Sequence, residues 1–416
     1  MNRYKHIGMA ATLFFSVSVS AQQNLEVMHF WTSGGEAAAL GIIKDHVEKQ
    51  GLGWEDAPVA GGGGDQAKTA LQARIAAGNP PAAMLILGQN IIGWANEGIL
   101  GDVTAVAEAE GWDEVLPKSV QDFNKINGAY VAAPTNVHRT DMIWASKAAF
   151  DAIDAEYPTT WAEFNSLAPR FVAAGIIPIA HGGQAWQEAY MFEAIVIGVG
   201  GPDFYRAALV DLNPEVLMSD EMEAVFSQIA NIRGMVDENF SGRDWNLATS
   251  MVINGEAAMQ IMGDWAKGEF TNAGKVPGKD YACIPVPKAH DSGFVYLINS
   301  LSFFEQPDSA QAEAQAKLAS AIMNPEVQVA FNLAKGAIPA RTDVDLSTLD
   351  ACAQSTSVDF IANDSDGTAV PTFAGTHASN ASVVAAVTDV VTEFFNTEMT
   401  PKEALVLLVE SVELAK

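Results

Sequence analysis

The sequence has 416 residues, 49% of them hydrophobic, and a formal net charge of -28 at pH 7. This acidity argues against a nucleic-acid partner and an anionic membrane surface, because both attract clustered lysines and arginines. Beyond the N-terminal segment, no apolar run is as long as the roughly 20 residues of a membrane-spanning helix. We therefore expect a soluble protein of about two or three domains.

The N-terminal segment predicts a cleaved export signal. Arg3 and Lys5 precede a short apolar run, and the small residues Ser20 and Ala21 follow it. This order is typical of a secretory signal peptide. Residues 1–21 are therefore expected to be removed near Ala21, which places the mature protein in the periplasm.

The following residues alternate short apolar strands with helices. Ser33 and Glu36 fit a capping box at the start of the first helix. Strands alternating with helices predict a mostly parallel α/β sheet. The strands are predicted at 25–30, 54–60 and 82–88, and the helices at 32–50 and 65–78.

Two extended segments, 130–137 and 294–304, are predicted to cross between two lobes. Between them lies a second α/β segment, whose first helix begins at Thr159 or Thr160. Its strands are predicted at 176–181 and 256–263, and its helices at 158–175, 187–198, 219–239 and 245–254. Later helices are predicted at 309–323, 325–334, 379–396 and 400–415, with an irregular stretch at 336–372.

The chain has two cysteines, Cys283 and Cys352. In an exported protein such an isolated pair predicts one disulfide rather than a metal site. No nucleophile elbow, H-E-x-x-H motif or complete calcium loop occurs, so no catalytic residue, metal or cofactor is predicted. His138 and His181 stand alone and are expected to be structural.

Several strings resemble extracellular solute-binding proteins of ATP-driven sugar importers, and glucose or mannose binders most closely. They are "HFWTSGGE", "PTTWAEF", "NGEAAMQIMGDWAKGEF" and "NLAKGAIPARTDV". The resemblance implies a periplasmic-binding-protein fold, type II-like, with two α/β lobes joined by hinge strands around a cleft. Lobe 1 would comprise 22–133 and about 294–340, and lobe 2 would comprise 134–293 and about 341–416. It also implies a monomer that docks on membrane permease subunits.

The resemblance carries over a set of sugar-binding side chains. Phe30 stands where these binders usually have a second tryptophan, Asn299 where an aspartate is expected, and Leu87 near a position that is usually polar. The expected ligand residues are Phe30, Trp31, Glu36, Gln89, Trp245, Trp265, Asn299, Lys335 and His377. Several have a structural alternative, namely helix capping for Glu36 and Lys335, a buried core position for Phe30 and the tryptophans, and an exposed loop for His377. The departures suggest a shifted sugar specificity.

The glycine run "GGGGDQAKT" is one residue short of a phosphate-binding loop, because Ala67 replaces its second glycine. In an exported protein of this kind, glycines between a strand and a helix are better explained by close approach to a ligand cleft. Gly62 and Gly63 are therefore weaker site candidates.

The sequence thus predicts a protein that binds a monosaccharide by hinge closure and delivers it to a permease. The alternatives are another solute on the same scaffold, such as an oligosaccharide, polyol or sulfonated sugar, an exported carbohydrate-active enzyme, or a receptor subunit for a membrane sensor.

Overall fold

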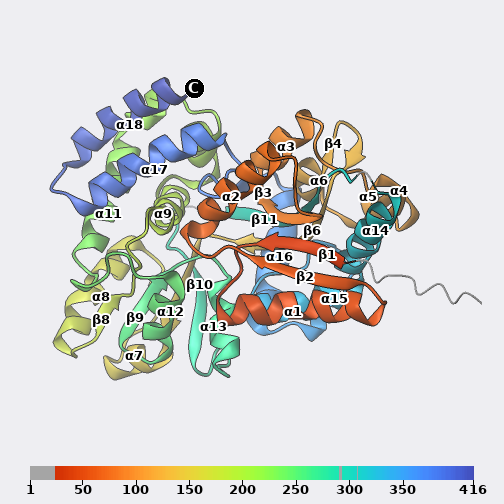
Figure 1. Cartoon of the computed structure of the whole chain (residues 1–416). Helices are drawn as coiled ribbons and strands as arrows, with labels where there is room; N and C mark the ends of the chain where they lie inside the picture. Colours follow the sequence, from red (N-terminus) through yellow and green to blue (C-terminus); the bar gives the residue numbers. More distant parts are fainter. Residues whose placement is uncertain (1–23, 290–292, 307) are drawn as a thin grey trace, which may run out of the picture.

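The fold contains two main β-sheets, and helices surround both of them (Figure 1). The computed structural model describes residues 24–289, 293–306 and 308–416. The predicted signal peptide, 1–21, lies outside the described residues. Within the described ranges, no helix has both the length and the apolar character needed to cross a bilayer.

The larger sheet has six strands, and three of them, β1, β2 and β3, correspond to the strands predicted at 25–30, 54–60 and 82–88. β1, β2 and β3 are parallel, with β1 between the other two. β11 is antiparallel to both β3 and β6, and β12 is parallel to β11. These strands are β1 Asn24–His29, β2 Gly53–Pro58, β3 Ala83–Leu87, β6 Ala132–Arg139, β11 Phe294–Phe303 and β12 Ala369–Pro371.

The smaller sheet has four strands in the order β10-β7-β9-β8. β8 and β9 are parallel and correspond to the predicted strands at 176–181 and 256–263. β7 is antiparallel to β9 and β10. Their bounds are β7 Met142–Ser146, β8 Ile177–Ile179, β9 Ala257–Ile261 and β10 Tyr281–Pro285. A further pair, β4 Lys125–Ile126 and β5 Ala129–Tyr130, forms a small hairpin.

The chain passes between the two sheets at the ends of β6 and β11. β6 leads through Thr140 and Asp141 directly into β7, and β11 follows β10 in the chain. Because β6 and β11 are paired along their lengths, the two passages lie next to each other. The extended segments predicted at 130–137 and 294–304 are thus strands, as expected.

Helices surround both sheets. The capping box of Ser33 and Glu36 is confirmed at α1, and Thr160 rather than Thr159 is the N-cap of α8. The bounds are α1 Gly34–Lys49, α2 Asp65–Ala76, α3 Gln89–Asn96, α4 Thr104–Ala109, α5 Trp112–Val115, α6 Lys118–Asn124, α7 Lys147–Ala152, α8 Trp161–Ala173, α9 Ala185–Tyr205, α10 Pro214–Leu217, α11 Asp220–Arg233, α12 Trp245–Ile253, α13 Ala266–Asn272, α14 Ser309–Met323, α15 Pro325–Lys335, α16 Ala351–Ser365, α17 Ala381–Asn396 and α18 Pro401–Ala415.

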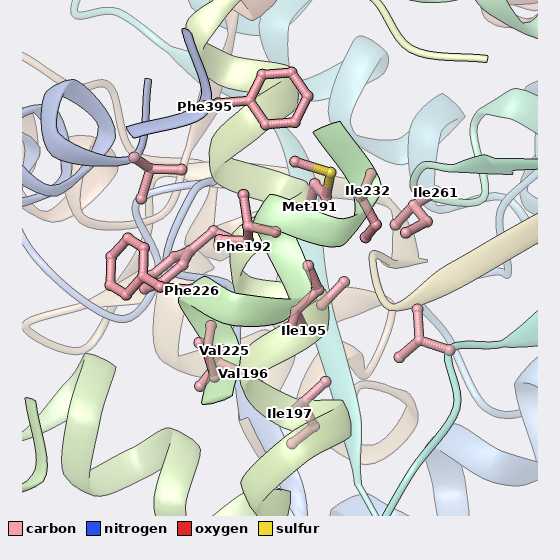
Figure 2. Close-up of a cluster of buried hydrophobic side chains, with 14 of the residues drawn as sticks. Met191, Phe192, Ile195, Val196, Ile197, Val225, Phe226, Ile232, Ile261 and Phe395 are labelled. Atoms are coloured by element: carbon pink, nitrogen blue, oxygen red, sulfur yellow. The ribbon is translucent and has the colours of Figure 1, made fainter. Parts of the chain in front are cut away.

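The core beside the smaller sheet is centred on α9. Figure 2 shows Met191, Phe192 and Ile195 of this helix among side chains of α11, together with Ile261 of β9 and Phe395 of α17. These residues are almost completely buried, which explains why α9 is apolar on nearly every side rather than amphipathic.

The prediction of an irregular stretch at 336–372 was wrong, because α16 occupies Ala351–Ser365. Asp350 caps this helix by accepting a hydrogen bond from the backbone of Ala353. The sequence "ACAQSTSVDFIANDS" lacks an apolar stripe, since the buried face includes Thr356 and Ser357. Such residues favour caps and turns, so the helix depends on its packing against the larger sheet.

Candidate functional site

A pocket of about 340 Å³ lies where loops of the two sheets meet. Most of the predicted ligand residues line it, namely Phe30, Trp31, Glu36, Gly63, Trp245, Trp265, Asn299 and Lys335. The other described lining residues are Thr32, Ser33, Ala60, Gly61, Leu87, His138, Gln184, Trp186, Tyr190, Asp244, Asn246 and Leu297. Segments that are far apart in the sequence thus contribute to one concave site, as ligand sites in α/β proteins commonly do.

Glu36 and Lys335 form an ion pair at this pocket. Lys335 is the last residue of α15 and only 2% exposed, and its Nζ lies 3.5 Å from Glu36 Oε1. Burial lowers the pKa of Lys335, although the carboxylate of Glu36 opposes that effect. The pair therefore presents ammonium donors beside a carboxylate acceptor, a combination that suits sugar hydroxyls.

The two oxygens of Glu36 have separate partners. Oε2 accepts hydrogen bonds from the backbone N–H groups of Thr32 and Ser33, at 3.2 and 3.3 Å, and so completes the capping box. Oε1 faces Lys335. Glu36 can therefore cap the helix with one oxygen and face the pocket with the other. The two explanations of this residue in the sequence do not exclude each other.

Aromatic rings provide much of the remaining wall. Trp31 lies below Lys335 Nζ, 5.5 Å from the ring centroid, and is only 2% exposed. Trp265 packs edge-on against Tyr190 and His138, with centroid distances of 5.1 and 5.2 Å. Rings of this kind bury the C–H faces of a sugar while their neighbours bind its hydroxyls.

A hydrogen-bonded chain of residues that the sequence analysis missed forms another wall. Gln184 donates to Asp244 Oδ1 at 2.7 Å and accepts from Trp186 Nε1 at 2.9 Å. Asp244 is the N-cap residue of α12, directly before Trp245. The sequence could have indicated Gln184 by its position alone. It lies in the loop after β8, at the carboxyl end of a parallel strand, where ligand sites of α/β proteins commonly lie.

Asn299 and Leu87 lie opposite each other in the antiparallel pair of β11 and β3, and both line the pocket. The two departures noted in the sequence are therefore neighbours in space. Leu87 adds an apolar wall, while Asn299 offers an uncharged amide in place of a carboxylate. Their proximity means that both substitutions affect the same part of the pocket.

His138 lines the pocket, although its isolated place in the sequence predicts a structural histidine. It lies on β6 and is 1% exposed. Nδ1 is hydrogen-bonded to Asp264, while Nε2 has no partner among the described residues. Burial lowers the pKa of His138, as does the charge of Lys335, whereas Asp264 opposes the effect.

The structure does not bring His377 or Gln89 to the pocket lining. His377 is 2% exposed, its Nδ1 donates to the carbonyl of Gly375 at 2.8 Å, and its Nε2 accepts from the backbone of Ile298 at 3.2 Å. Gln89 donates to the carbonyl of His377 at 3.2 Å. Both ring nitrogens of His377 are therefore occupied by the backbone, which explains its burial without a ligand.

The glycine run lies beside the pocket. Gly63 has φ 59°, and a Cβ there would lie 3.0 Å from the ring of Trp186. A Cβ on Gly64 would lie equally close to Phe30. A side chain at either position would force the neighbouring ring to shift, and the positive φ of both residues also favours glycine. Gly62 belongs to the same turn, Gly62–Gly64, but its surroundings lie outside the described part of the structure.

The predicted disulfide between Cys283 and Cys352 is present. It joins β10 of the smaller sheet to the first turn of α16, whose residue Phe360 belongs to the core of the larger sheet. Cys352 belongs to the same buried cluster as Trp265 and Tyr190, although neither cysteine lines the pocket. Among the described residues, no cluster of three histidine, cysteine or acidic side chains is arranged to hold a metal ion.

The chain is similar to known binding proteins. The sequence profile of the bacterial extracellular solute-binding protein family matches residues 48–340. A probable sugar-binding periplasmic protein of Rhizobium meliloti (strain 1021) is 47% identical over 408 residues, 98% of each chain.

Among solved structures, a chitin oligosaccharide binding protein has a TM-score of 0.77 at 19% identity, covering 94% of this chain and 98% of its own. The solute receptor AcbH, described as preferring β-D-galactopyranose, has a TM-score of 0.77 at 14% identity, covering 95% and 98%. The structural matches confirm the predicted two-lobed α/β fold.

Proposed function

Since the chain belongs to the bacterial extracellular solute-binding protein family, we propose that it is the periplasmic sugar-binding component of an ATP-driven importer. The observation that carries this proposal is the pocket itself, which is lined by aromatic residues together with the Glu36–Lys335 pair. Sugars need both kinds of contact, because they have apolar C–H faces and many hydroxyls. The relative from Rhizobium meliloti bears a sugar-binding name as well.

We propose a monosaccharide resembling glucose or mannose as the ligand. The charged groups of the described lining are the carboxylates of Glu36 and Asp244 and the ammonium of Lys335. These charges favour a neutral ligand over a sulfonated sugar, whose anion would lie near two carboxylates. Leu87 and Asn299 alter the polar contacts at one side, which supports a specificity shifted from that of other glucose binders.

The mechanism proposed is capture by hinge closure. Lobe 1 would comprise 22–133 and about 294–340, and lobe 2 would comprise 134–293 and about 341–416. The pocket draws residues from elements of both sheets, so a sugar that contacts all of them stabilises the closed state. The closed monomer would then dock on the permease subunits, while a separate subunit hydrolyses ATP.

A second candidate ligand, an oligosaccharide, is favoured by one observation. A smaller pocket of about 110 Å³ adjoins the main one and shares Phe30, Gly63, Leu87, Trp186 and Tyr190 with it. A second sugar ring or other substituent could extend there. A polyol ligand, a carbohydrate-active enzyme and a receptor subunit for a membrane sensor are the remaining alternatives, and the enzyme would require a catalytic carboxylate pair.

Calorimetry with D-glucose, D-mannose, D-galactose, maltose and a sulfonated glucose tests the proposal. We expect binding of a neutral hexose, an increase in melting temperature with that sugar, and unchanged sugar after prolonged incubation. Absence of heat and of thermal stabilisation with every compound would reject the sugar-binding function. Tight binding of maltose alone would favour the oligosaccharide ligand, and hydrolysed maltose would favour an enzyme.

A further inference from the structure

An unpaired nitrogen lies within the wall of the pocket. His138 Nε2 is buried and has no hydrogen-bond partner among the described residues, and His138 is one of the residues that line the pocket. Nearly all buried polar atoms in folded proteins have partners, so an exception requires an explanation. The position of this ring suggests that the missing partner arrives with the ligand.

The other ring nitrogen determines what kind of partner is missing. Nδ1 is hydrogen-bonded to Asp264, and an ionised carboxylate can only accept. Nδ1 must therefore carry the proton. In a neutral imidazole, Nε2 is then a pure acceptor, so the partner it lacks is a donor such as a hydroxyl group.

Asp264 is held in place by the chain around it. Its Oδ2 accepts from the backbone N–H of Arg139 at 3.0 Å, and its own N–H donates to the carbonyl of Arg139 at 2.9 Å. Asp264 follows β9 of the smaller sheet, while His138 lies on β6 of the larger sheet. The imidazole is thus oriented at the passage between the sheets, before any ligand arrives.

Three charged groups act on the ring from the elements around it. They are Asp264 after β9, Lys335 at the end of α15 and Glu36 at the start of α1. Burial and the charge of Lys335 lower the pKa of His138, and the two carboxylates oppose this effect. The net direction keeps the ring neutral at pH 7.

We propose that His138 binds a hydroxyl of the sugar by accepting its hydrogen at Nε2, with Asp264 as the positioning residue. The inference rests on the proposed sugar-binding function and adds a residue and a hydrogen-bond polarity to it. Protonation converts Nε2 into a donor, so the same contact makes sugar affinity decrease at acid pH.

The test begins with wild-type protein and D-glucose, D-mannose, D-galactose and maltose, titrated calorimetrically at pH 7.5. The sugar that binds is then used with two variants. His138→Asn can still donate to Asp264 but places no atom at the position of Nε2, whereas His138→Gln can offer its amide oxygen near that position. His181→Gln is the matched control, because His181 is also buried with an unpaired Nε2 but does not line the pocket.

We expect His138→Asn to weaken binding by about 10-fold or more and His138→Gln by about 3-fold or less, as for loss and partial replacement of one hydrogen bond. His181→Gln should bind like the wild type. As the pH falls far enough to protonate Nε2, affinity should decrease more for the wild type than for either His138 variant.

Nitrogen-15 NMR of the histidine rings gives a readout that a merely structural role would not change. At pH 7.5 His138 should show a protonated Nδ1 and a bare Nε2, and the Nε2 resonance should shift when the sugar binds. A protonated Nε2 in the free protein overturns the inference, and so does wild-type affinity in a folded His138→Asn variant. If no sugar binds at all, the proposed function fails and the inference fails with it.

Discussion

Glu36 Oε1 and Lys335 Nζ lie 3.5 Å apart, so the first turn of α1 meets the last residue of α15 at the pocket. Both side chains are largely withdrawn from water, with exposed fractions of 12% and 2%. Opposite charges in such surroundings depend on each other and on further hydrogen bonds. A sugar hydroxyl between or beside them would supply those bonds.

Replacing Glu36 by Gln separates its two roles. Glutamine at this position still supports a capping box, but it leaves the buried Lys335 without its charge partner, so the free energy of unfolding should decrease. The loss of a charged acceptor should weaken sugar binding by about 10- to 100-fold, as expected for a hydrogen bond to a charged group. Calorimetry and thermal melts measure the two effects. Glu48→Gln, at an exposed position of the same helix, should bind normally; equal affinity for both variants would contradict the role of Glu36.

Gly63→Ala should weaken sugar binding, because the added methyl would lie 3.0 Å from the ring of Trp186 and shift a residue that lines the pocket. Gly78→Ala is the matched control. Gly78 also has a positive φ, 69°, but a Cβ there meets nothing within 4 Å. Both variants should therefore share a backbone cost of about 1 kcal/mol in stability. Only Gly63→Ala should increase Kd, and similar Kd values for the two variants would show that the ring contact is unimportant.

The Cys283–Cys352 bond closes a loop with a sequence separation of 69. Replacing both cysteines by serine should reduce the free energy of unfolding by about 2–5 kcal/mol, chiefly by releasing a constraint on the unfolded chain. Urea denaturation measures this loss. Wild-type protein unfolded in the presence of dithiothreitol should have the same unfolding free energy as the double variant. The prediction would be contradicted if the double variant were as stable as the oxidised wild type.

His377 should make stability depend on pH. Burial lowers its pKa to about 4, compared with an ordinary value of 6.5. As pH falls below 6.5, the unfolded chain therefore binds a proton before the folded protein does. The stabilisation is complete above pH 6.5 and is lost towards pH 4, to a total of about 3 kcal/mol. In His377→Gln the decrease in unfolding free energy over this interval should be smaller by that amount.

Asp141 should be important for the passage between the sheets. It is fully buried and accepts hydrogen bonds from Arg139 Nε at 3.1 Å and from the backbone of Val295 at 3.0 Å, while Lys288 Nζ lies 3.2 Å away. Asp141→Asn leaves the buried Arg139 and the partly buried Lys288 without this charge partner. We expect a loss of about 3–5 kcal/mol in unfolding free energy.

Asp151→Asn is the control for this change, because Asp151 forms an exposed i,i+4 pair with Lys147. Such a pair contributes about 0.5 kcal/mol or less. Urea denaturation of the two variants should therefore separate them clearly. Equal stabilities would show that the buried charge cluster is not important for the fold.

Much of the pocket could be predicted from the sequence, because many of its residues lie in recognisable strings. Trp31 and Glu36 lie in one such string, and Trp265 and Lys335 lie in others. Gln184 and Trp186 were not predicted, since the loop after β8 matches no string and enters the pocket only when the sheets come together. His377, by contrast, was predicted to bind the ligand but does not line the pocket. The backbone groups that occupy its ring nitrogens meet it only in the folded chain.

By itself, the sequence determined the local elements and the chemical character of the protein. Apolar periodicity, capping residues such as Ser33 and Thr160, and the isolated cysteine pair specify features that depend on few other residues. Only the tertiary structure decided that α16 is a helix, that Glu36 meets Lys335, and that His138 retains a bare nitrogen at the pocket. Those features depend on packing and burial between segments remote in the sequence, because desolvation and hydrogen-bond partners exist only once the segments meet.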